Sequence, residues 1–374
     1  MSISRRLMMG LTLLPCLMFS TAQAHDDDDD DDKGVAGAVY TLTNAVDGNK
    51  VLAFNRAGDG SLLPTGEYAT GGLGSGGGLG NQGAVILSED GRWLFAINAG
   101  SNEISVFAVR PGGLVLTDTV DSGGVLPVSV TADRDLLYVL NAGSDNISGF
   151  HVNRRGKLEP LAGSTRPLSG SGTAPAQISF SPEGDLLVVT EKATNRIDTY
   201  VVGKDGLATG PSVHASAGLT PFGFAFDPRG RLVVSEAAGG AFEASSVTSY
   251  SVTEDGDLQA ISAAVPTTET AACWVVITGN GRYAYTTNAG SGSLAGYAIG
   301  RDGRLSLLDP DGRSGVTGDG STPVDMAFAN NSRYLYTLNA GADTISAFSV
   351  DADGALHALS TVNLPDGTNG LAAR

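Results

Sequence analysis

The 374-residue chain is poor in cysteine, histidine and aromatic side chains, and no stretch of it repeats apolar residues at helical spacing over a useful length. Cys16 lies in a segment that resembles an export signal, so Cys273 is left alone and no intramolecular disulfide is expected. The chain has no Cys-x-x-Cys pair, and its four histidines lack metal-ligand spacing. We therefore expect no metal and no cofactor.

Basic residues are also scarce. The chain has 23 Lys and Arg against 40 Asp and Glu, which gives a formal net charge of −17. Nucleic acids and anionic membrane surfaces attract proteins of the opposite charge. The sequence therefore predicts neither of them as a partner.

The first 24 residues have the pattern of a signal peptide. Arg5 and Arg6 precede an apolar stretch over residues 7–19, and Ala22-Gln23-Ala24 forms a small-residue cleavage site. The apolar stretch is too short to span a bilayer, which predicts export without membrane insertion. We expect a periplasmic or secreted protein.

Residues 25–36 follow as an acidic tail. His25 would be the mature N-terminus, and it precedes the aspartate run Asp26 to Asp32. Such a run is typical of a disordered, solvated segment. Weak capture of divalent cations is the alternative interpretation.

From residue 37 to 374 a unit repeats seven times. Its marker is an Asn-Ala-Gly turn between two short apolar runs, or a degenerate copy of it, and the markers lie about 43 to 54 residues apart. Seven units made of short strands indicate an all-β fold, the seven-bladed β-propeller. The markers are Asn44, Asn98, Asn141, Glu191, Glu236, Asn288 and Asn339.

The two ends of the repeat region complement each other. Val39–Leu42 corresponds to the second strand of a blade, so the first blade lacks its inner strand, and residues 368–373 have the pattern of that strand. We expect the ring to be closed by pairing the C-terminal strand with the N-terminal blade, which removes exposed sheet edges.

In a propeller the seven marker turns share one face with the loops that enter the inner strands. The asparagines have a structural explanation, since Asn caps turns and the following Gly accepts a positive φ. Glutamate is no turn former, so Glu191 and Glu236 suggest an added task. Simple solvated carboxylates are the alternative.

Other unusual residues fall on the same rim. Gln177, Trp274 and Asp325 occupy equivalent positions in their inner strands, and Cys273 precedes Trp274. Together with further rim residues they form the predicted ligand-binding set, for a polar ring-shaped ligand with one apolar face. The alternative is that Cys273 and Trp274 simply pack between blades six and seven. The further members are Lys192, Arg196 and Asn288.

The glycine-rich segment over residues 70–80 is not a phosphate loop, because it lacks Gly-Lys-Ser/Thr and precedes a strand. We expect it to lengthen the loop that enters blade two, on the same rim, where it would act as a lid.

The chain resembles the lactonase-type seven-bladed propellers, which include 6-phosphogluconolactonase-like proteins and carboxymuconate cycloisomerases and overlap with YVTN-repeat propellers. The resemblance rests on Ser181-Pro-Glu-Gly184, on Thr194 to Tyr200, and on the Tyr-x-x-Asn turns that end at Asn141, Asn288 and Asn339. It implies a site on the same face that handles a lactone ring with a glutamate and basic residues. Where those enzymes place His or Arg, this chain has Pro175-Ala-Gln177 and Pro221-Phe-Gly223.

Two functions remain open. The first, which we favour, is a monomeric exported propeller that binds a small-molecule or carbohydrate-like ligand, such as a sugar acid, lactone or glycan. The second is a lactone hydrolase in which Glu191 or Glu236 is the base and Lys192, Arg196 or Gln177 steadies the oxyanion. Export argues against phosphorylated gluconolactone as the substrate, since that metabolite is cytoplasmic.

Overall fold

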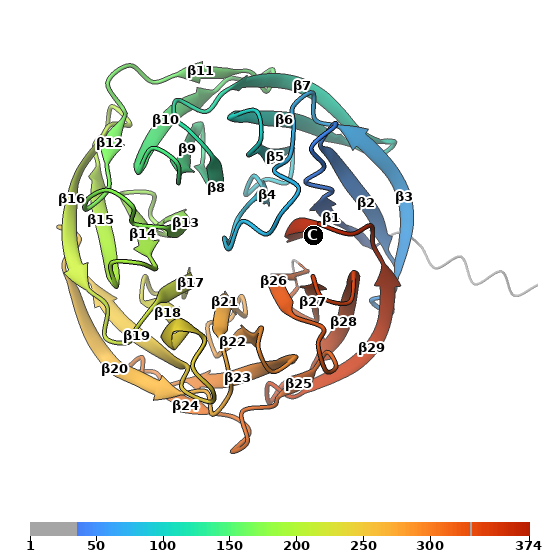
Figure 1. Cartoon of the computed structure of the whole chain (residues 1–374), viewed down its shortest axis with the longest axis vertical. Coiled ribbons are helices and arrows are strands. Elements are labelled where there is room, and N and C mark those ends of the chain that lie inside the picture. The colour runs from blue at the N-terminus through green and yellow to red at the C-terminus, as the bar shows by residue number, and fades with distance from the viewer. Residues whose placement is uncertain (1–35, 330) are drawn as a thin grey trace, which may run out of the picture. The chain divides into compact units, whose positions relative to one another are not determined.

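The computed structural model describes residues 36–329 and 331–374, all within the unit Gly34–Arg374. The predicted signal peptide and all of the acidic tail except Ala36 lie outside the described residues. Seven four- or five-stranded antiparallel sheets surround one axis (Figure 1), and the prediction of a seven-bladed β-propeller is confirmed. The described part of the chain has no helix long and apolar enough to cross a membrane.

Each blade runs from an inner strand at the axis to an outer strand at the circumference. Blade one holds β30 (Asn369–Ala373), β1 (Gly37–Leu42), β2 (Lys50–Arg56) and β3 (Leu62–Ala69). Blade two holds β4 (Val85–Leu87), β5 (Trp93–Asn98), β6 (Glu103–Arg110) and β7 (Gly113–Asp121). Blade three holds β8 (Pro127–Asp133), β9 (Leu136–Asn141), β10 (Asn146–Val152), β11 (Leu158–Pro160) and β12 (Arg166–Pro167).

The remaining blades follow the same order. Blade four holds β13 (Pro175–Phe180), β14 (Leu186–Glu191), β15 (Arg196–Val202) and β16 (Ala208–Ala215). Blade five holds β17 (Pro221–Phe226), β18 (Leu232–Glu236), the short 3-10 turn η1 (Ala238–Gly240), β19 (Ser246–Val252) and β20 (Leu258–Pro266). Blade six holds β21 (Ala272–Ile277), β22 (Tyr283–Asn288), β23 (Ser293–Ile299), β24 (Leu305–Leu307) and β25 (Gly315–Val316). Blade seven holds β26 (Pro323–Phe328), β27 (Tyr334–Asn339), β28 (Thr344–Val350) and β29 (Leu356–Asn363).

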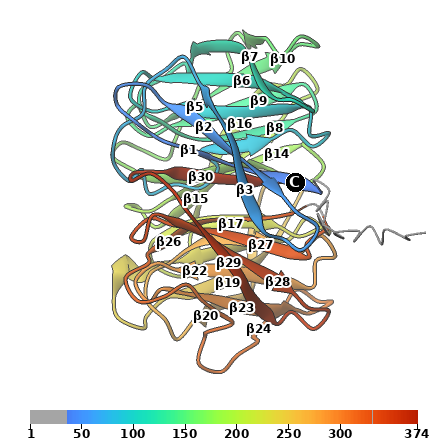
Figure 2. The ribbon, with the colours of Figure 1, turned by 90° about the vertical axis from the view of Figure 1, so that its right-hand side faces the viewer.

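The expected ring closure is present. Strand β30 pairs antiparallel with β1, where Val39 faces Ala373 and Leu42 faces Asn369, and the two lie side by side in Figure 2. Thr41 donates a side-chain hydrogen bond of 2.6 Å to the Gly370 carbonyl. Blade one therefore combines three strands from the start of the described chain with one from its end.

Buried tyrosines link neighbouring blades. Tyr138 donates from its hydroxyl to the Gly206 carbonyl of the next blade at 2.7 Å, and Tyr285 reaches Gly354 in the same way. Tyr336 reaches Gly60 at 2.8 Å and so crosses the closure. Gly206, Gly354 and Gly60 each follow an aspartate in a hairpin turn. The tyrosine of the Tyr-x-x-Asn motif in one blade thus donates to the carbonyl of an Asp-Gly hairpin in the next blade.

The marker turns correct two expectations. The glycine of Asn-Ala-Gly does not adopt a positive φ; that conformation belongs to the fourth residue after the marker, which is Asn102, Asp145, Asn195, Gly292 or Asp343. Glycine is needed for close approach instead: a Cβ on Gly100 would lie 2.1 Å from the Gly74 oxygen. In blade one, Thr43 rather than Asn44 continues the β1–β2 register, and Asn44 binds Ser75 and Gly77.

Candidate functional site

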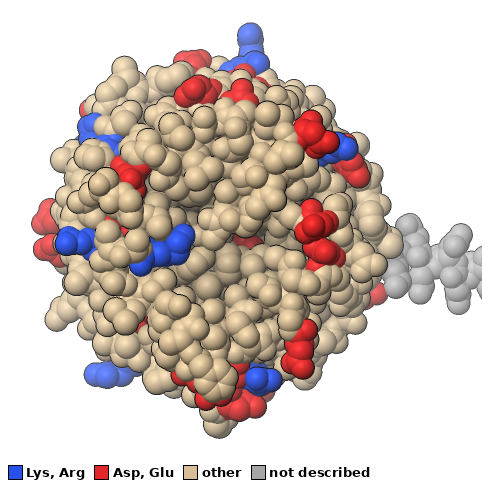
Figure 3. Space-filling model, viewed as in Figure 1, with Lys and Arg blue, Asp and Glu red and all other residues tan. Residues whose placement is uncertain are grey.

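The marker turns lie at one end of the ring, which we call the asparagine end, and the turns between first and second strands lie at the other, the hairpin end. The charged side chains visible in Figure 3 lie mostly toward the periphery of the face it shows.

The glycine-rich loop between β3 and β4 continues into the axis of the propeller. Figure 1 shows it running from the rim toward the centre. Asn81 donates to the Val128 carbonyl of blade three and accepts from the Trp274 indole of blade six at 2.6 Å. The Gln82 side chain accepts a hydrogen bond of 3.2 Å from the Val275 N–H and donates one of 2.9 Å to the Val275 carbonyl. The segment over residues 80–82, which we call the bridge, therefore spans the channel rather than standing beside it as a lid.

Beyond the bridge the channel holds adjoining cavities of about 280 and 430 Å³. Gln82 and Gln177 line both cavities, and Asp325 lines the smaller one. Toward the hairpin end the wall becomes apolar, with Phe180, Phe226, Ile277 and Phe328.

The inner-strand residues expected to bind ligand also join blades. Gln177 donates to the Phe224 carbonyl at 3.0 Å and accepts from the Phe224 N–H at 2.7 Å. Asp325 accepts from the N–H of Leu371 in β30 at 3.0 Å, across the ring closure, and burial raises the pKa of its carboxyl to about 8. Both residues hold a neighbouring strand, and their assignment to a ligand remains a prediction.

Lys192 is the centre of the group that the asparagine end brings together. Its ammonium donates to the carbonyls of Gly80 and Pro175 and lies 4.8 Å from the centre of the Phe222 ring. Its described partners include no carboxylate, and burial lowers the pKa of the amine to about 8. Lys192 is only half-buried, so it is a cation without an anionic partner that solvent still reaches.

Aromatic residues complete this group. The rings of Phe222 and Trp274 lie 4.8 Å apart at an interplanar angle of 52°. Cys273 is buried beside them and donates to the Ala271 carbonyl at 3.2 Å, and burial raises the pKa of its thiol to about 12. The thiol is therefore protonated at neutral pH and is no nucleophile. We call Lys192, Phe222, Cys273 and Trp274, with Gly80 above them, the lysine cluster.

Neither Glu191 nor Glu236 forms a hydrogen bond or an ion pair with Lys192. Glu191 is fully buried and accepts from the Ser169 N–H at 2.9 Å and from the hydroxyls of Ser169 and Thr194. Asp198 shares the Ser169 N–H at 2.8 Å, and burial together with Glu191 raises the pKa of Asp198 to about 8. Glu191 and Asp198 thus form a carboxyl pair that holds a proton well above the usual range.

Glu236 is equally buried. It accepts from the Gly218 N–H at 2.9 Å, from the hydroxyls of Thr248 at 2.6 Å and Ser216 at 3.4 Å, and from Ser246. All four donors belong to blade five or to the loop before it, so the described contacts of the carboxylate hold the fold together. The catalytic role of both glutamates stays a prediction.

The last two residues of the predicted ligand-binding set, Arg196 and Asn288, do not contribute side-chain contacts to the lysine cluster. Arg196 is exposed at the start of β15, and Asn288 is fully buried with its amide on the Ser293 hydroxyl at 3.0 Å. Phe222 and the bridge residues Asn81 and Gln82 were not expected at the site. None of them carries a repeat marker. The long glycine-rich loop signals the bridge, and Phe222 lies between Pro221 and Gly223, where the related enzymes place His or Arg.

Comparisons with known proteins agree with this architecture. A model of the family "Lactonase, 7-bladed beta-propeller" matches residues 48–166 and 233–370. A 6-phosphogluconolactonase of Serratia proteamaculans is 25% identical over 267 residues, which cover 70% of this chain and 78% of that protein.

Solved structures share the fold. A putative 6-phosphogluconolactonase from Bacteroides fragilis has a TM-score of 0.73 at 20% identity, covering 90% of this chain and 98% of that one. A periplasmic gluconolactonase from Pseudomonas aeruginosa has a TM-score of 0.68 at 17% identity, covering 88% and 98%. At such identities the likeness concerns the fold alone.

Proposed function

Because the chain belongs to the lactonase family of seven-bladed β-propellers, we propose that it binds a lactone, or the sugar acid that a lactone yields, at the lysine cluster. The observation that carries this proposal is the half-buried Lys192 ammonium, whose described partners are two backbone carbonyls and an aromatic ring. A carboxylate or a polarised lactone carbonyl is the partner such a cation lacks.

The aromatic pair supports a ring-shaped ligand. Phe222 and Trp274 form an apolar surface next to the cation, and small-molecule sites commonly combine such a surface with few polar groups. The carbonyls of Gly80 and Pro175 take two of the three donors of the Lys192 ammonium, which leaves the third for a ligand that approaches from the solvent.

Lactone hydrolysis is the second candidate, and it is favoured by the names of the relatives, a 6-phosphogluconolactonase and a periplasmic gluconolactonase. In that reaction water adds to the carbonyl carbon, the ring C–O bond breaks, and the products are a carboxylate and an alcohol. Lys192 would stabilise the oxyanion, while Glu191 or Glu236 would have to exchange its hydrogen-bonded position for one facing the ligand. Export to the periplasm or beyond, predicted from residues 1–24, would give this activity extracytoplasmic substrates.

The test compares gluconate binding and lactone hydrolysis in the same proteins. Trp93 and Trp274 are the two tryptophans of the chain, so the Trp93→Phe variant leaves Trp274 as the reporter of the lysine cluster. In that background Lys192→Met should weaken gluconate binding at least tenfold, since a charge-assisted hydrogen bond contributes about 1.5–3 kcal/mol. Lys204→Met, which removes an exposed lysine in the turn after β15, is the matched control.

Hydrolysis is followed as acid release from a lactone panel above the spontaneous rate. Turnover that disappears in the Glu191→Gln, Glu236→Gln double variant, with its fold intact, would establish the hydrolase. Binding that requires Lys192 without turnover would establish the binding function. Equal affinity of the Lys192→Met and Lys204→Met variants would exclude the lysine cluster as the ligand site.

Binding should also depend on pH. Since the pKa of Lys192 is lowered to about 8, raising the pH through 8 removes the positive charge and should weaken binding of an anion. An affinity for gluconate that stays constant from pH 7 to 9 would contradict the assignment.

A further inference from the structure

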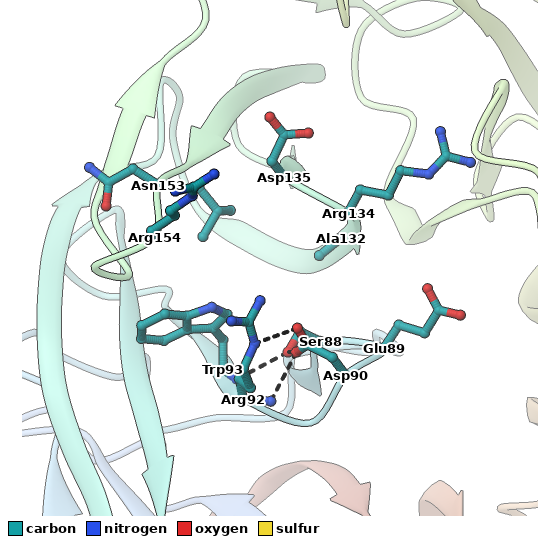
Figure 4. A pocket seen from close by; sticks show the side chains of 11 residues that line it. Ser88, Glu89, Asp90, Arg92, Trp93, Ala132, Arg134, Asp135, Asn153 and Arg154 are labelled. Carbon is teal, nitrogen blue, oxygen red and sulfur yellow. Dashed lines mark hydrogen bonds and ion pairs between the residues drawn. The ribbon is translucent and has the colours of Figure 1, made fainter.

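A second cleft opens at the hairpin end, between blades two and three. It has a volume of about 340 Å³, and its walls come from the β4–β5 turn, the β8–β9 turn and the start of the β10–β11 turn. Figure 4 shows Trp93 and Arg92 on one wall and Arg154 and Asn153 on the facing wall. The cleft lies at the opposite end of the propeller from the lysine cluster, so it forms a separate site.

Trp93 gives this cleft a fixed aromatic wall. The indole is half-buried at the start of β5, and the backbone of the β10–β11 turn lies against it: a Cβ on Gly156 would come within 2.3 Å of the ring. Gly156 also has a φ of 69°, which a side chain would disfavour. Among residues 36–329 and 331–374, the Trp93 indole N–H has no hydrogen-bond partner. The indole is thus fixed by packing while its N–H remains available to a ligand.

Two of the three arginines that line the cleft have an aspartate beside them, and the third does not. Arg92 is paired with Asp90 at 2.5 Å, and Arg134 lies 3.7 Å from Asp133. Arg154 is exposed and has neither an ion pair nor a hydrogen bond from its side chain within the described chain. The wall facing Trp93 therefore carries the Arg154 guanidinium, whose five N–H donors are available to a ligand.

Carboxylates occupy the rest of the cleft. Glu89 is exposed and also has no described partner, while Asp135 lies 3.7 Å from His151. Figure 4 shows Glu89 and Asp135 apart from Arg154. A ligand would thus meet a cation, an indole and hydrogen-bond-accepting oxygens within one cavity.

We propose that this cleft binds a hydroxylated carboxylic acid of monosaccharide size, a uronic acid or the acidic end of a glycan. The carboxylate of such a ligand pairs with Arg154, its ring lies against Trp93, and its hydroxyls donate to Glu89 and Asp135. Planar guanidinium groups bind carboxylates through two parallel hydrogen bonds, and carboxylates are acceptors for sugar hydroxyls. The volume is at the lower limit for small-molecule sites, roughly 300–1,000 Å³, which suits one sugar residue.

The experiment uses sodium glucuronate and the Trp274→Phe variant, in which Trp93 is the remaining fluorophore. We expect saturable quenching of Trp93 that weakens about tenfold in Arg154→Gln, because a charge-assisted contact is lost. Arg155→Gln, which changes the neighbouring exposed arginine outside the cleft, should keep the affinity. Added salt should weaken binding, since the guanidinium is exposed.

Ligand-detected NMR on the unsubstituted protein and on Arg154→Gln repeats the comparison without altering Trp274. No saturable signal in either experiment, or equal affinity in Arg154→Gln and Arg155→Gln, would overturn the proposal. Equal binding of neutral glucose or of zwitterionic glycine would also overturn it, since neither presents the proposed combination of groups. Because Trp274 reports on the lysine cluster and Trp93 on this cleft, failure at one site is distinguishable from failure at the other.

Discussion

Four blades end their second strand with asparagine, at positions 98, 141, 288 and 339, whereas the two adjacent blades four and five end it with glutamate. Blade four keeps the turn length of the asparagine blades, and blade five has a longer turn that contains η1. All six side chains are fully buried. The same place in the repeat thus holds an amide in one region and a carboxyl group in the other.

The difference lies in the direction of the hydrogen bonds. The Asn339 amide donates to the hydroxyls of Thr344 and Ser346 at 3.1 and 2.8 Å. In blade two the Asn98 amide donates to the Ser105 hydroxyl, and that hydroxyl donates to the Thr70 carbonyl at 2.8 Å. Around Glu236 the hydroxyls donate inward instead. A buried asparagine at this position needs hydrogen-bond acceptors from the next strand, and a buried glutamate needs donors from the next strand and the preceding loop.

The largest effect should come from Glu236→Ala. This change leaves the Gly218 N–H and three hydroxyls without their acceptor in a buried site, and we expect a loss of about 4 kcal/mol in the free energy of unfolding. Denaturant unfolding measures it. Glu236→Gln, which keeps the shape, should cost less, and a smaller loss for Glu236→Ala than for Asn339→Ala would refute the structural role.

Exchanging the two types should be nearly as harmful. Asn141→Glu places a carboxylate where the amide now donates toward the Ser148 hydroxyl and the Ser122 carbonyl, at 3.1 and 3.5 Å. One hydroxyl cannot replace the four donors that surround Glu236, so we expect about 3 kcal/mol of destabilisation in the same assay. Unchanged stability would mean that the blades tolerate either residue.

Removing an asparagine should have a moderate effect. Asn339→Ala deletes two side-chain hydrogen bonds between uncharged groups, from the amide to the hydroxyls of Thr344 and Ser346. The expected loss is about 1.5 kcal/mol. A loss equal to that of Glu236→Ala would show that the carboxyl blades are not special.

The mildest change should be Asp198→Asn, which tests the carboxyl pair of blade four. Because the folded-state pKa of Asp198 is raised to about 8, the carboxyl opposes folding increasingly as pH rises from its unfolded pKa toward 8. The asparagine variant should therefore match the unsubstituted protein at acidic pH and be the more stable of the two near pH 8. Parallel stability curves across that range would contradict a shared proton between Glu191 and Asp198.

Most of the fold is predictable from the sequence. The seven markers give the seven sheets, because apolar runs and turn residues repeat in every blade. The missing inner strand of blade one follows from the same repeat.

The site is less predictable. The sequence predicts a positive φ for the glycine of Asn-Ala-Gly, but glycine is needed there because the backbone of a neighbouring loop leaves no room for a Cβ. Glu191 and Glu236 are visible in the sequence as exceptions to the repeat, but the hydroxyls that surround them are scattered along the chain. Lys192 and Trp274 reach the bridge through the backbone carbonyls of Gly80 and Asn81, 112 and 193 positions away, and backbone carbonyls carry no sequence signature.

Strand β30 has a consequence for the order in which the molecule is made. Every other strand leaves the ribosome before it, so blade one presents an unpaired β1 edge throughout synthesis. Six blades are able to form their sheets as they emerge, whereas the first blade to be translated is the last to be completed. During that interval the nascent chain has an open sheet edge, and a chaperone that covers β1 would favour the folded ring over aggregation.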